Sequence, residues 1–335
     1  MEFTYFIGID VSKNELDFAV MHGKNLLFHR EIANDAKTIS AFIMELKKMP
    51  GFKLSEALFC MEHTGIYNNI LMSQLYKNGS NCWLEPASQI KNSMGNVRGK
   101  NDKVDAMRIA EYAYKNREYV RLWQPKRDVV KQLAHLVAVR TRLIAAHKML
   151  KTPLSEGAGF VDRDIQKQAR LLCRKAIASI GESLKNTEKS IAETIASDKE
   201  LSRLFGIISS VHSIGTVTAV QIIITTNEFK DISDPKKFAC YSGVAPFVKE
   251  SGIYRGKGRV SHMANKTMKT LLHMSALSAI SRDGEMKAYF ERKVKQEKKN
   301  KMLVINAVRN KLIMRVFACV THNRKYEKDF VRRVA

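Results

Sequence analysis

The stretch FIGIDVSK, residues 6–13, decides the fold class of the N-terminal part of the chain. The apolar run over residues 3–9 predicts a buried β-strand that closes at Asp10. Two further runs, over residues 15–21 and 26–32, are separated by His22-Gly23-Lys24-Asn25. Glycine and asparagine at that point are typical of a hairpin turn, so we expect three consecutive strands.

The pattern then alternates between helix and strand. Helical spacing covers residues 36–49 and 67–77, and short apolar runs at 57–61 and 81–84 predict strands, the first of which ends at Glu62. Three strands followed by alternating helices and strands is the order of an α/β layer with a mixed sheet. We therefore expect an α/β domain over residues 1–125.

A long helical segment follows, over residues 126–200. Apolar residues from Val129 to Leu150 repeat at heptad spacing, and Thr152-Pro153 with Gly157-Ala158-Gly159 predicts a turn. A second helix is expected over residues 162–196. The two would form a coiled-coil hairpin, which either mediates self-association or packs on its own domain.

The remainder, residues 201–335, is predicted to be a mainly α-helical domain. The sequence SIGTVTAVQI lies within an apolar stretch at 204–226 and fits either a helix-hairpin-helix that presents backbone N–H groups to phosphate or an ordinary helix pair. A segment rich in glycine, serine and basic residues follows, and further helices are expected at 264–281 and 302–321.

The composition points to a polyanionic partner. The chain has 335 residues, with 57 lysines and arginines against 33 aspartates and glutamates, which gives a net charge of +24. Such an excess suits nucleic acid or an anionic membrane. No apolar run is long enough to cross a bilayer and no signal peptide is evident, so we favour nucleic acid and a cytoplasmic location. The five cysteines are scattered without a CxxC pair, which argues against a disulfide framework or a zinc finger.

Four acidic residues in this basic chain are candidate metal ligands. Asp10 and Glu62 close predicted strands, and Asp102 and Asp105 share one face of a predicted helix. Mg²⁺ prefers carboxylate oxygens, so several such side chains must converge to hold it. Taken singly, each is better explained as a helix cap or a surface charge. As a set they predict a Mg²⁺ site, with Mn²⁺ as an alternative ion.

Basic residues expected to contact nucleic acid occur in two groups. The first flanks the acidic motifs and comprises Lys13, Arg98, Lys100 and Lys103. The second lies in the glycine-rich segment and the helix after it, and comprises Arg255, Lys257, Arg259, Lys266 and Lys269. Glycines between these side chains let the backbone approach phosphates. Phe247 and Tyr254 are candidates for stacking on bases or for the core.

The motifs GIDVSK, EHTGIY and GKNDKVDA, in this order and spacing, resemble the DEDD motifs of the insertion-sequence-110 family of transposases. Members are also known as bridge-RNA-guided recombinases, and the Piv-type DNA invertases are relatives. The later segment FACYSGVAPFVKESG resembles the second domain of the family, and the resemblance covers nearly the whole chain.

This resemblance carries specific expectations. It implies an RNase H-like, RuvC-like N-terminal domain whose metal-binding tetrad is Asp10, Glu62, Asp102 and Asp105. It also implies a serine that forms a covalent link to DNA, and by motif position this is Ser251. Ser242 also precedes a glycine and competes for the role. The expected partners are donor and target DNA, a structured guide RNA, and further copies of the chain in a dimer or tetramer, in a prokaryotic cytoplasm with nucleoid association.

The expected function is a transposase or recombinase that cuts and rejoins DNA to mobilise an insertion sequence. A site-specific DNA invertase of the same chemistry is the nearest alternative. A RuvC-like junction resolvase or nuclease needs the carboxylates but no serine. A nucleic-acid-binding protein with a degenerate nuclease fold is disfavoured because all four acidic positions are present.

Overall fold

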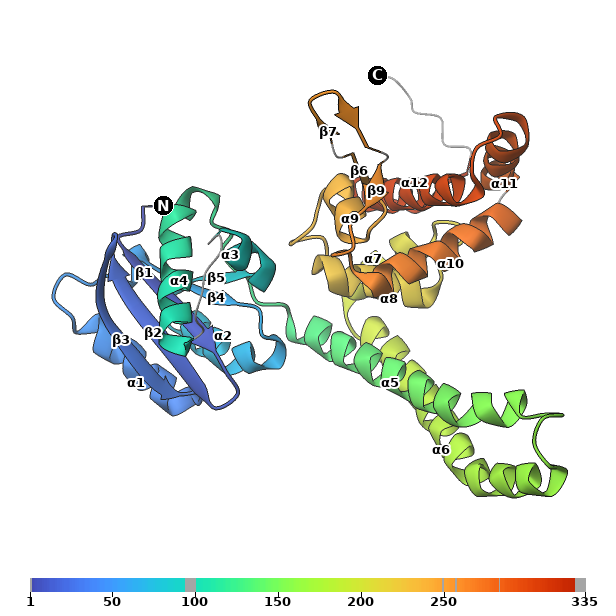
Figure 1. The fold of residues 1–335 in the computed structure, drawn as a ribbon, viewed down its shortest axis with the longest axis horizontal. Coiled ribbons are helices and arrows are strands. Elements are labelled where there is room, and N and C mark those ends of the chain that lie inside the picture. The colour runs from blue at the N-terminus through green and yellow to red at the C-terminus, as the bar shows by residue number, and fades with distance from the viewer. Residues whose placement is uncertain (1, 94–100, 249, 257, 283, 329–335) are drawn as a thin grey trace. The chain divides into compact units, whose positions relative to one another are not determined.

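The computed structural model describes residues 2–93, 101–248, 250–256, 258–282 and 284–328. The chain forms two compact units, one ending at Pro125 and the other beginning at Lys126. Each unit has its own apolar core. Figure 1 shows the course of the chain through both.

The first unit is built on a five-stranded mixed sheet in the order β3-β2-β1-β4-β5. β1 pairs antiparallel with β2, and β2 with β3, while β1–β4 and β4–β5 are parallel. This confirms the α/β layer expected from the sequence. The strands are β1 (Tyr5–Val11), β2 (Glu15–His22), β3 (Asn25–Ala33), β4 (Ala57–Glu62) and β5 (Asn81–Glu85).

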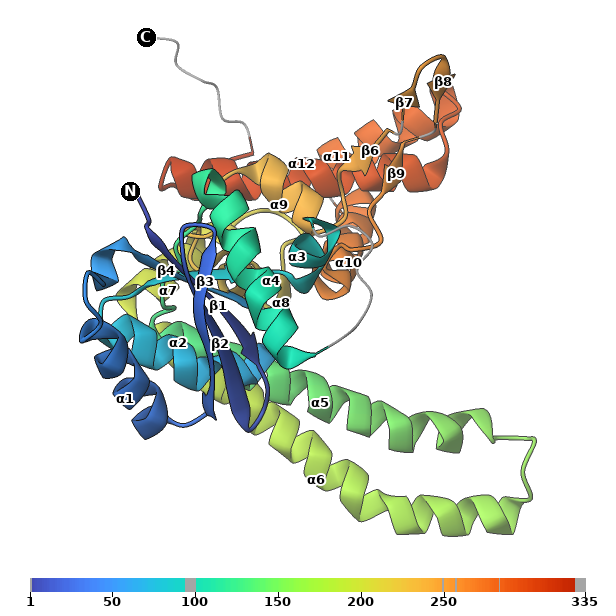
Figure 2. The same ribbon diagram turned by 60° about the vertical axis from the view of Figure 1, so that its left-hand side comes forward.

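Helices cover both faces of this sheet, because successive strand residues bury opposite sides. Ile7 and Ile9 of β1 pack with α1 and α2 on one face, and Phe6 packs with α4 on the other. Figures 1 and 2 show α4 crossing that second face. The helices of this unit are α1 (Ala36–Lys47), α2 (Asn68–Lys77), α3 (Ala87–Ser93) and α4 (Asp102–Lys115), with single turns at Leu54–Glu56, Gly65–Tyr67 and Arg117–Tyr119.

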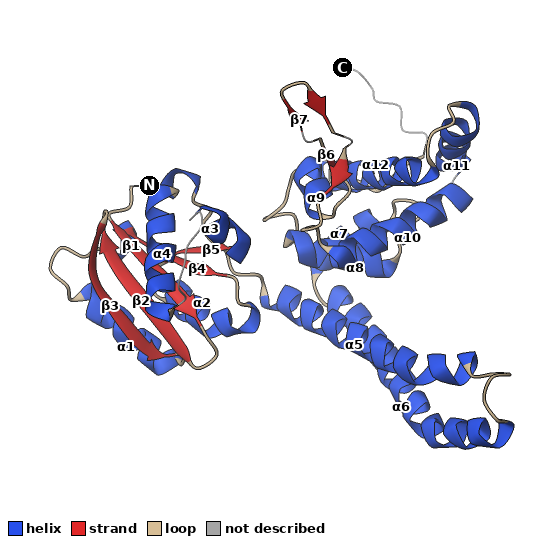
Figure 3. Cartoon of the chain, in the orientation of Figure 1, coloured by secondary structure: helices blue, strands red, loops and turns tan. Residues whose placement is uncertain are grey.

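The second unit is mainly helical, as Figure 3 shows. α7, α8, α10 and α12 share one core, which the beginning of α5 and the end of α6 join. α5 and α6 lie side by side, yet their buried residues are confined to the parts near that core. The helices are α5 (Asp128–Glu156), α6 (Arg163–Ala196), α7 (Lys199–Ser209), α8 (Thr216–Thr226), α9 (Pro235–Tyr241), α10 (Lys266–Arg282), α11 (Gly284–Glu291) and α12 (Lys301–Thr321), with a π-helical turn at Arg292–Gln296.

Two short ribbons interrupt the helices between α9 and α10. β6 (Pro246–Phe247) pairs antiparallel with β9 (Arg259–Val260), and β7 (Glu250–Ser251) pairs antiparallel with β8 (Tyr254–Arg255). From the sequence, we expected a segment rich in glycine, serine and basic residues here and predicted no strands. Strands of two residues leave no periodicity to detect.

The expected turn between the two long helices is present at Gly157-Ala158-Gly159, but it begins later than predicted. α5 does not stop at Thr152-Pro153 but continues through Pro153 to Glu156. Proline removes one backbone hydrogen bond from a helix, and that loss is tolerated here because the residues around Pro153 are exposed to solvent. The end of α1 is also earlier than expected, at Lys47.

No helix in the described parts of the chain combines the length and the apolar character that crossing a bilayer requires.

Candidate metal centre and candidate nucleophile

Asp10 and Glu62 lie at the same edge of the sheet. In the parallel pair of β1 and β4, Ile9 is opposite Met61, so the next residues along each strand are Asp10 and Glu62. The alternation of strand side chains puts both on the face that α4 covers. Asp10 is thus a residue within β1, which extends to Val11, rather than the residue that ends it.

α4 approaches this face unusually closely, and Gly8 is the reason. A Cβ atom at Gly8 would lie 2.1 Å from the carbonyl oxygen of Ala106 and 2.2 Å from the backbone nitrogen of Ala110. No side chain fits there, so the glycine of the GID motif lets the helix backbone rest on the strand. Asp10 is two residues further along the same face, where the first turn of α4 lies.

That first turn carries Asp102 and Asp105. Asn101 caps the helix, because its side chain accepts a hydrogen bond from the backbone N–H of Lys103 at 3.0 Å. Asp105 is half-buried and accepts a hydrogen bond from Arg108 Nη1 at 2.7 Å, whereas Asp102 is exposed. The positive end of the helix dipole favours negative charge at these positions. The two aspartates are therefore explained by helix stability as well as by the predicted metal binding.

The pKa of Asp10 reflects its burial and the proximity of the other three carboxylates. Burial, followed by the charges of Asp102, Asp105 and Glu62, raises the pKa of Asp10 from 3.8 to about 6. Three carboxylates therefore lie close enough to disfavour ionisation of the fourth. Such a cluster of negative charge is stable only when a cation or protons compensate it.

The loop after Glu62 is held by Asn68. The Asn68 side chain, almost fully buried, donates to the carbonyl oxygen of Glu62 at 2.9 Å and accepts from the backbone N–H of Thr64 at 2.7 Å. Gly65 has a φ of 75°, a left-handed conformation that favours glycine. The EHTG motif thus forms a tight turn that fixes the end of β4.

Two more acidic residues adjoin the four, and the sequence analysis missed both. Asp17 is directly opposite Asp10 in the β1–β2 pair and its Oδ1 lies 2.7 Å from His29 Nε2. Glu85 is opposite Glu62 in the β4–β5 pair, accepts a hydrogen bond from Trp83 Nε1 at 2.9 Å, and has its pKa raised by burial. An acidic residue at an inward-facing position of a predicted strand was the available signal.

No group of three or more histidine, cysteine, aspartate or glutamate side chains among the described residues, which include all four candidates, is drawn together tightly enough to hold an ion. The four are neighbours without forming a coordination shell. The donor set still fits a hard divalent cation, because it consists of carboxylates around one partly buried carboxyl group whose charge is disfavoured.

The predicted basic contacts have different settings. Lys13 is exposed in the β1–β2 turn and Lys103 is exposed at the start of α4. Arg259 and Lys266 are exposed and Lys269 is half-buried, all in the second unit. Arg98, Lys100 and Lys257 lie outside the described residues, and of Arg255 only the backbone is described.

The two candidate serines differ in accessibility. Ser251 is exposed in β7. Ser242 is fully buried at the end of α9, where its hydroxyl donates to the carbonyl oxygen of Phe238 at 2.8 Å. Ser251 belongs to the second unit, so it is not among the side chains that the sheet and α4 gather.

Two family profiles match the chain. Residues 7–156 match the DEDD transposases of IS110, and residues 206–291 match the transposase family of IS116, IS110 and IS902. Together the matched ranges span more than half of the chain. The chain belongs to the IS110 family of transposases. It is therefore an enzyme of DNA recombination.

Curated relatives agree with this assignment. The chain is 24% identical to the pilin gene-inverting protein of Moraxella bovis over 340 residues, covering 96% of this chain and 98% of the relative. It is 26% identical to the protein of the same name from Moraxella lacunata, covering 69% of each. An uncharacterized 44.8 kDa protein of insertion element IS116 from Streptomyces clavuligerus is 22% identical, covering 86% of this chain and 88% of the relative.

Proposed function

We propose that this IS110-family enzyme mobilises an insertion sequence by cutting and rejoining DNA, with a carboxylate tetrad for metal and a serine nucleophile. The observation that carries the proposal is the cluster at the α4 face of the sheet, where burial and three neighbouring carboxylates raise the pKa of Asp10 to about 6. A carboxylate cluster in a chain of net charge +24 serves a metal ion on a polyanion.

Asp10, Glu62, Asp102 and Asp105 would hold Mg²⁺ or Mn²⁺. The ion would neutralise charge on the phosphodiester and lower the pKa of a hydroxyl group there. Asn101 and Asn68 position the tetrad by fixing the helix start and the loop after β4. Arg108, paired with Asp105, limits the free movement of that carboxylate.

Ser251 is the proposed nucleophile, and its exposure beside the burial of Ser242 supports the choice. Its Oγ forms a bond to phosphorus while the bond from phosphorus to one deoxyribose oxygen breaks. The serine proton is lost and the leaving oxygen gains one, so the phosphodiester is exchanged for a phosphoserine diester. Because one ester replaces another, rejoining needs no external energy source.

The proposal extends to fold and partners. The sheet order, with three antiparallel strands and two parallel ones, supports an RNase H-like, RuvC-like domain. The paired helices α5 and α6 support a coiled-coil arm that joins copies of the chain into a dimer or tetramer. DNA and a structured bridge RNA are the proposed partners, and the nucleoid in a prokaryotic cytoplasm is the proposed location.

The nucleophile is tested by trapping the protein–DNA adduct. Ser251→Ala should abolish a covalent adduct on denaturing gels while DNA binding is retained. Ser242→Ala is the matched control and should leave the adduct. An adduct that persists in Ser251→Ala rejects this serine. Cleavage without an adduct in the wild type would favour a metal-dependent resolvase or nuclease that uses water.

The metal site is tested by amide substitution. Asp10→Asn and Asp105→Asn should each lower strand exchange by at least about a hundredfold, because each removes a charge from the ion's ligands. EDTA should have the same effect. Glu111→Gln, on the exposed part of α4, is the control and should retain activity. Unchanged exchange in the aspartate variants would remove the tetrad from the mechanism.

A site-specific DNA invertase is the second candidate, favoured by the printed names of the two Moraxella relatives. The chemistry is the same and the substrate differs. An inversion assay on a DNA segment flanked by inverted sites tests for the invertase. Insertion of the DNA that flanks the gene would instead indicate a transposase.

A further inference from the structure

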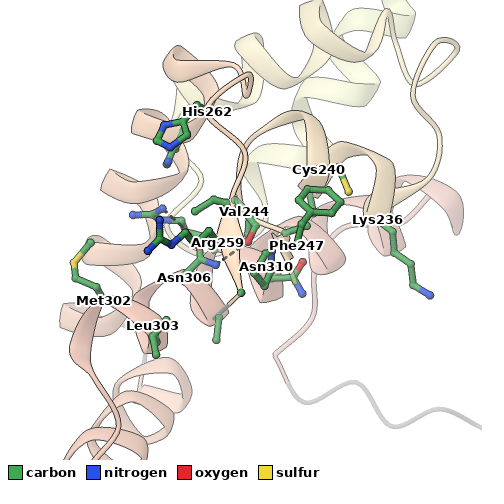
Figure 4. A pocket seen from close by; sticks show the side chains of 18 residues that line it. Lys236, Cys240, Val244, Phe247, Arg259, His262, Met302, Leu303, Asn306 and Asn310 are labelled. Atoms are coloured by element: carbon green, nitrogen blue, oxygen red, sulfur yellow. Dashed lines mark hydrogen bonds between the residues drawn. The ribbon is translucent and has the colours of Figure 1, made fainter. Parts of the chain in front are cut away.

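A cavity in the second unit lies next to the segment that carries Ser251. It has a volume of about 1060 Å³ and its walls come from α9, β6, β9, α10 and α12. Figure 4 shows Arg259, Asn306 and Val244 near its centre, with Met302 and Leu303 to one side and Lys236 to the other. A volume at the upper limit of ordinary ligand pockets admits a nucleotide-sized group.

Arg309 of α12 lines this cavity and is only 6% exposed. Its Nε is a buried donor without a hydrogen-bond partner. Its other contacts are neutral: Nη1 donates to Asn306 Oδ1 at 3.4 Å and Nη2 lies against His273 Nδ1. A buried guanidinium normally has a carboxylate beside it, because the cost of removing its charge from water is otherwise uncompensated.

Compensation from a neighbouring carboxylate is lacking among the residues that the structure describes. None of those that line the cavity is an aspartate or glutamate, and their ion pairs include none with Arg309. Burial lowers the pKa of Arg309, and burial followed by the nearby charge of Arg309 lowers the pKa of His273. The imidazole is therefore a neutral neighbour and not a counter-ion.

Further cations stand around the cavity. Lys236, Arg259 and Lys269 line it together with Arg309, while its apolar wall includes Phe247, Val260, Met302 and Leu303. Phe247 is 49% exposed. An anionic group bound at Arg309 would thus have an apolar neighbour on which an attached base can pack.

We propose that this cavity binds a phosphodiester of the DNA strand, with Arg309 donating to the phosphate and an adjacent base against the apolar wall. The inference rests on the proposed function and assigns a contact to it. Ser251 is four positions after Phe247, so the serine is within about 14 Å of the cavity's edge, the span of four extended residues. A phosphate held there lies within a few nucleotides of the phosphate that Ser251 attacks.

Residues 244–246 form part of the wall of this cavity, and close contacts hold the backbone of this segment in place. Gly243 has a φ of 64° and a Cβ there would lie 2.5 Å from the Cβ of Ala264. Asn306 Nδ2 donates to the carbonyl oxygen of Val244 at 2.7 Å, which ties the segment before β6 to α12. The SGVAP motif thereby holds Phe247 and Arg309 on one cavity, which gives this motif a role in binding.

The unmodified protein allows a direct test through its cysteines. Cys240 lines the cavity and is half-buried, and Cys173 in α6 is half-buried and far from it in sequence. The full chain is alkylated with N-ethylmaleimide, with and without a saturating single-stranded oligodeoxynucleotide, and both sites are followed by mass spectrometry. We expect the oligonucleotide to slow alkylation of Cys240 at least fivefold and to leave Cys173 unchanged.

A substitution supplies the second arm. Arg309→Met keeps the side-chain volume and removes the buried charge, so the free protein should unfold at an equal or higher urea concentration. Its affinity for the oligonucleotide should fall about tenfold or more, because a charge-assisted hydrogen bond is lost, and the salt dependence of binding should decrease by about one phosphate contact. Lys287→Gln, which removes an exposed charge of the same unit, is the matched control and should change affinity less than about twofold.

Three results would overturn the proposal. One is equal alkylation of Cys240 with and without bound DNA. Another is an Arg309→Met protein that loses stability and keeps its DNA affinity, which is the behaviour of a purely structural arginine. The third is protection of Cys240 by an oligoribonucleotide of the same sequence but not by the DNA, which assigns the cavity to RNA. Failure of the proposed function is separate, because it shows as absent strand exchange while Cys240 is still protected.

Discussion

At the scale of single residues, the candidate metal centre depends on the absence of a side chain at position 8. Gly8 has no side chain, and for that reason α4 can lie against β1 with Asp102 and Asp105 near Asp10. The four acidic residues are the candidate metal ligands, and Gly8 allows them to lie close together. A residue without a reactive side chain thus positions the candidate ligands.

Gly8→Ala should separate the two elements. The added Cβ would lie 2.1 Å from Ala106 O, so α4 must move away, at a cost of roughly 3 kcal/mol or more in the free energy of unfolding. Strand exchange should be lost as well, because Asp102 and Asp105 move with α4. Urea unfolding and an exchange assay measure both effects. Gly206→Ala, a helix position with open space around it, should be neutral or slightly stabilising.

Asp10→Asn should change stability in a pH-dependent way. The pKa of Asp10 is about 6 in the folded protein against an ordinary 3.8, so the folded state binds this proton more tightly than the unfolded state. The penalty from its charge is absent below pH 3.8, grows as pH rises, and is complete above pH 6. Without divalent ions, Asp10→Asn should therefore raise the free energy of unfolding by about 1–2 kcal/mol near pH 7.5.

The same substitution should have little effect below about pH 4, where the wild-type carboxyl group is protonated in both states. Urea unfolding at both pH values measures the difference. A gain that is equal at the two pH values would contradict the electrostatic explanation. Adding Mg²⁺ should stabilise the wild type more than Asp10→Asn, because the ion compensates the charge that the variant lacks.

At the scale of elements, Arg127 joins three segments of the second unit. It precedes α5 and donates to Asp198, the N-cap of α7, at 2.8 Å, and to Glu228, which follows α8, at 2.5–3.2 Å. The side chain of Glu228 is 1% exposed. The arginine holds the pKa of Asp198 at about 2. The ion pair of Arg127 and Asp198 fixes the place where α5 and α6 join the helical core.

Arg127→Met should destabilise the protein by about 3 kcal/mol, because Glu228 is left buried with Lys230 as its one remaining ion-pair partner among the described residues. Urea unfolding of the wild type and the variant measures the loss. Lys131→Met, which removes an exposed pair with Asp128 on the same helix, should cost less than about 1 kcal/mol. Adding Glu228→Gln to Arg127→Met should recover part of the loss, and a further loss would contradict the argument.

At the scale of the whole molecule, the net positive charge has to be distinguished from the two candidate sites. The chain carries +24, but its acidic cluster is confined to one face of the sheet in the first unit, and the cavity around Arg309 belongs to the second. Strong positive charge attracts any nucleic acid, whereas the cluster and the cavity are the proposed sites for particular phosphates.

DNA binding by the whole chain should therefore be strongly dependent on salt. Between about 50 and 200 mM salt, we expect the affinity for a duplex to fall about a thousandfold, since several phosphate contacts each release counterions. Fluorescence anisotropy with a labelled duplex measures the affinity. A decrease of less than about tenfold would mean that few of the basic side chains of the chain contact phosphates.

Local patterns in the sequence were sufficient to predict the mixed sheet, its helices and the order of the acidic motifs. Alternation, helical spacing and turn residues act over a few residues and so remain visible without a fold. The same reasoning misplaced the end of α5, because solvent exposure near Pro153 decides whether a proline ends a helix there. It also missed the ribbons of two residues, which have no periodicity.

By itself, the sequence determined which residues are candidates for the chemistry: four carboxylates in three motifs, an excess of basic residues, and a serine in a glycine-rich segment. Only the tertiary structure decided which of them meet. Strand register set Asp17 beside Asp10 and Glu85 beside Glu62, and the packing of α12 buried Arg309 without a counter-ion from the described part of the chain. The physical reason is that pairing and burial join residues far apart in the chain, whereas sequence patterns report only on neighbours.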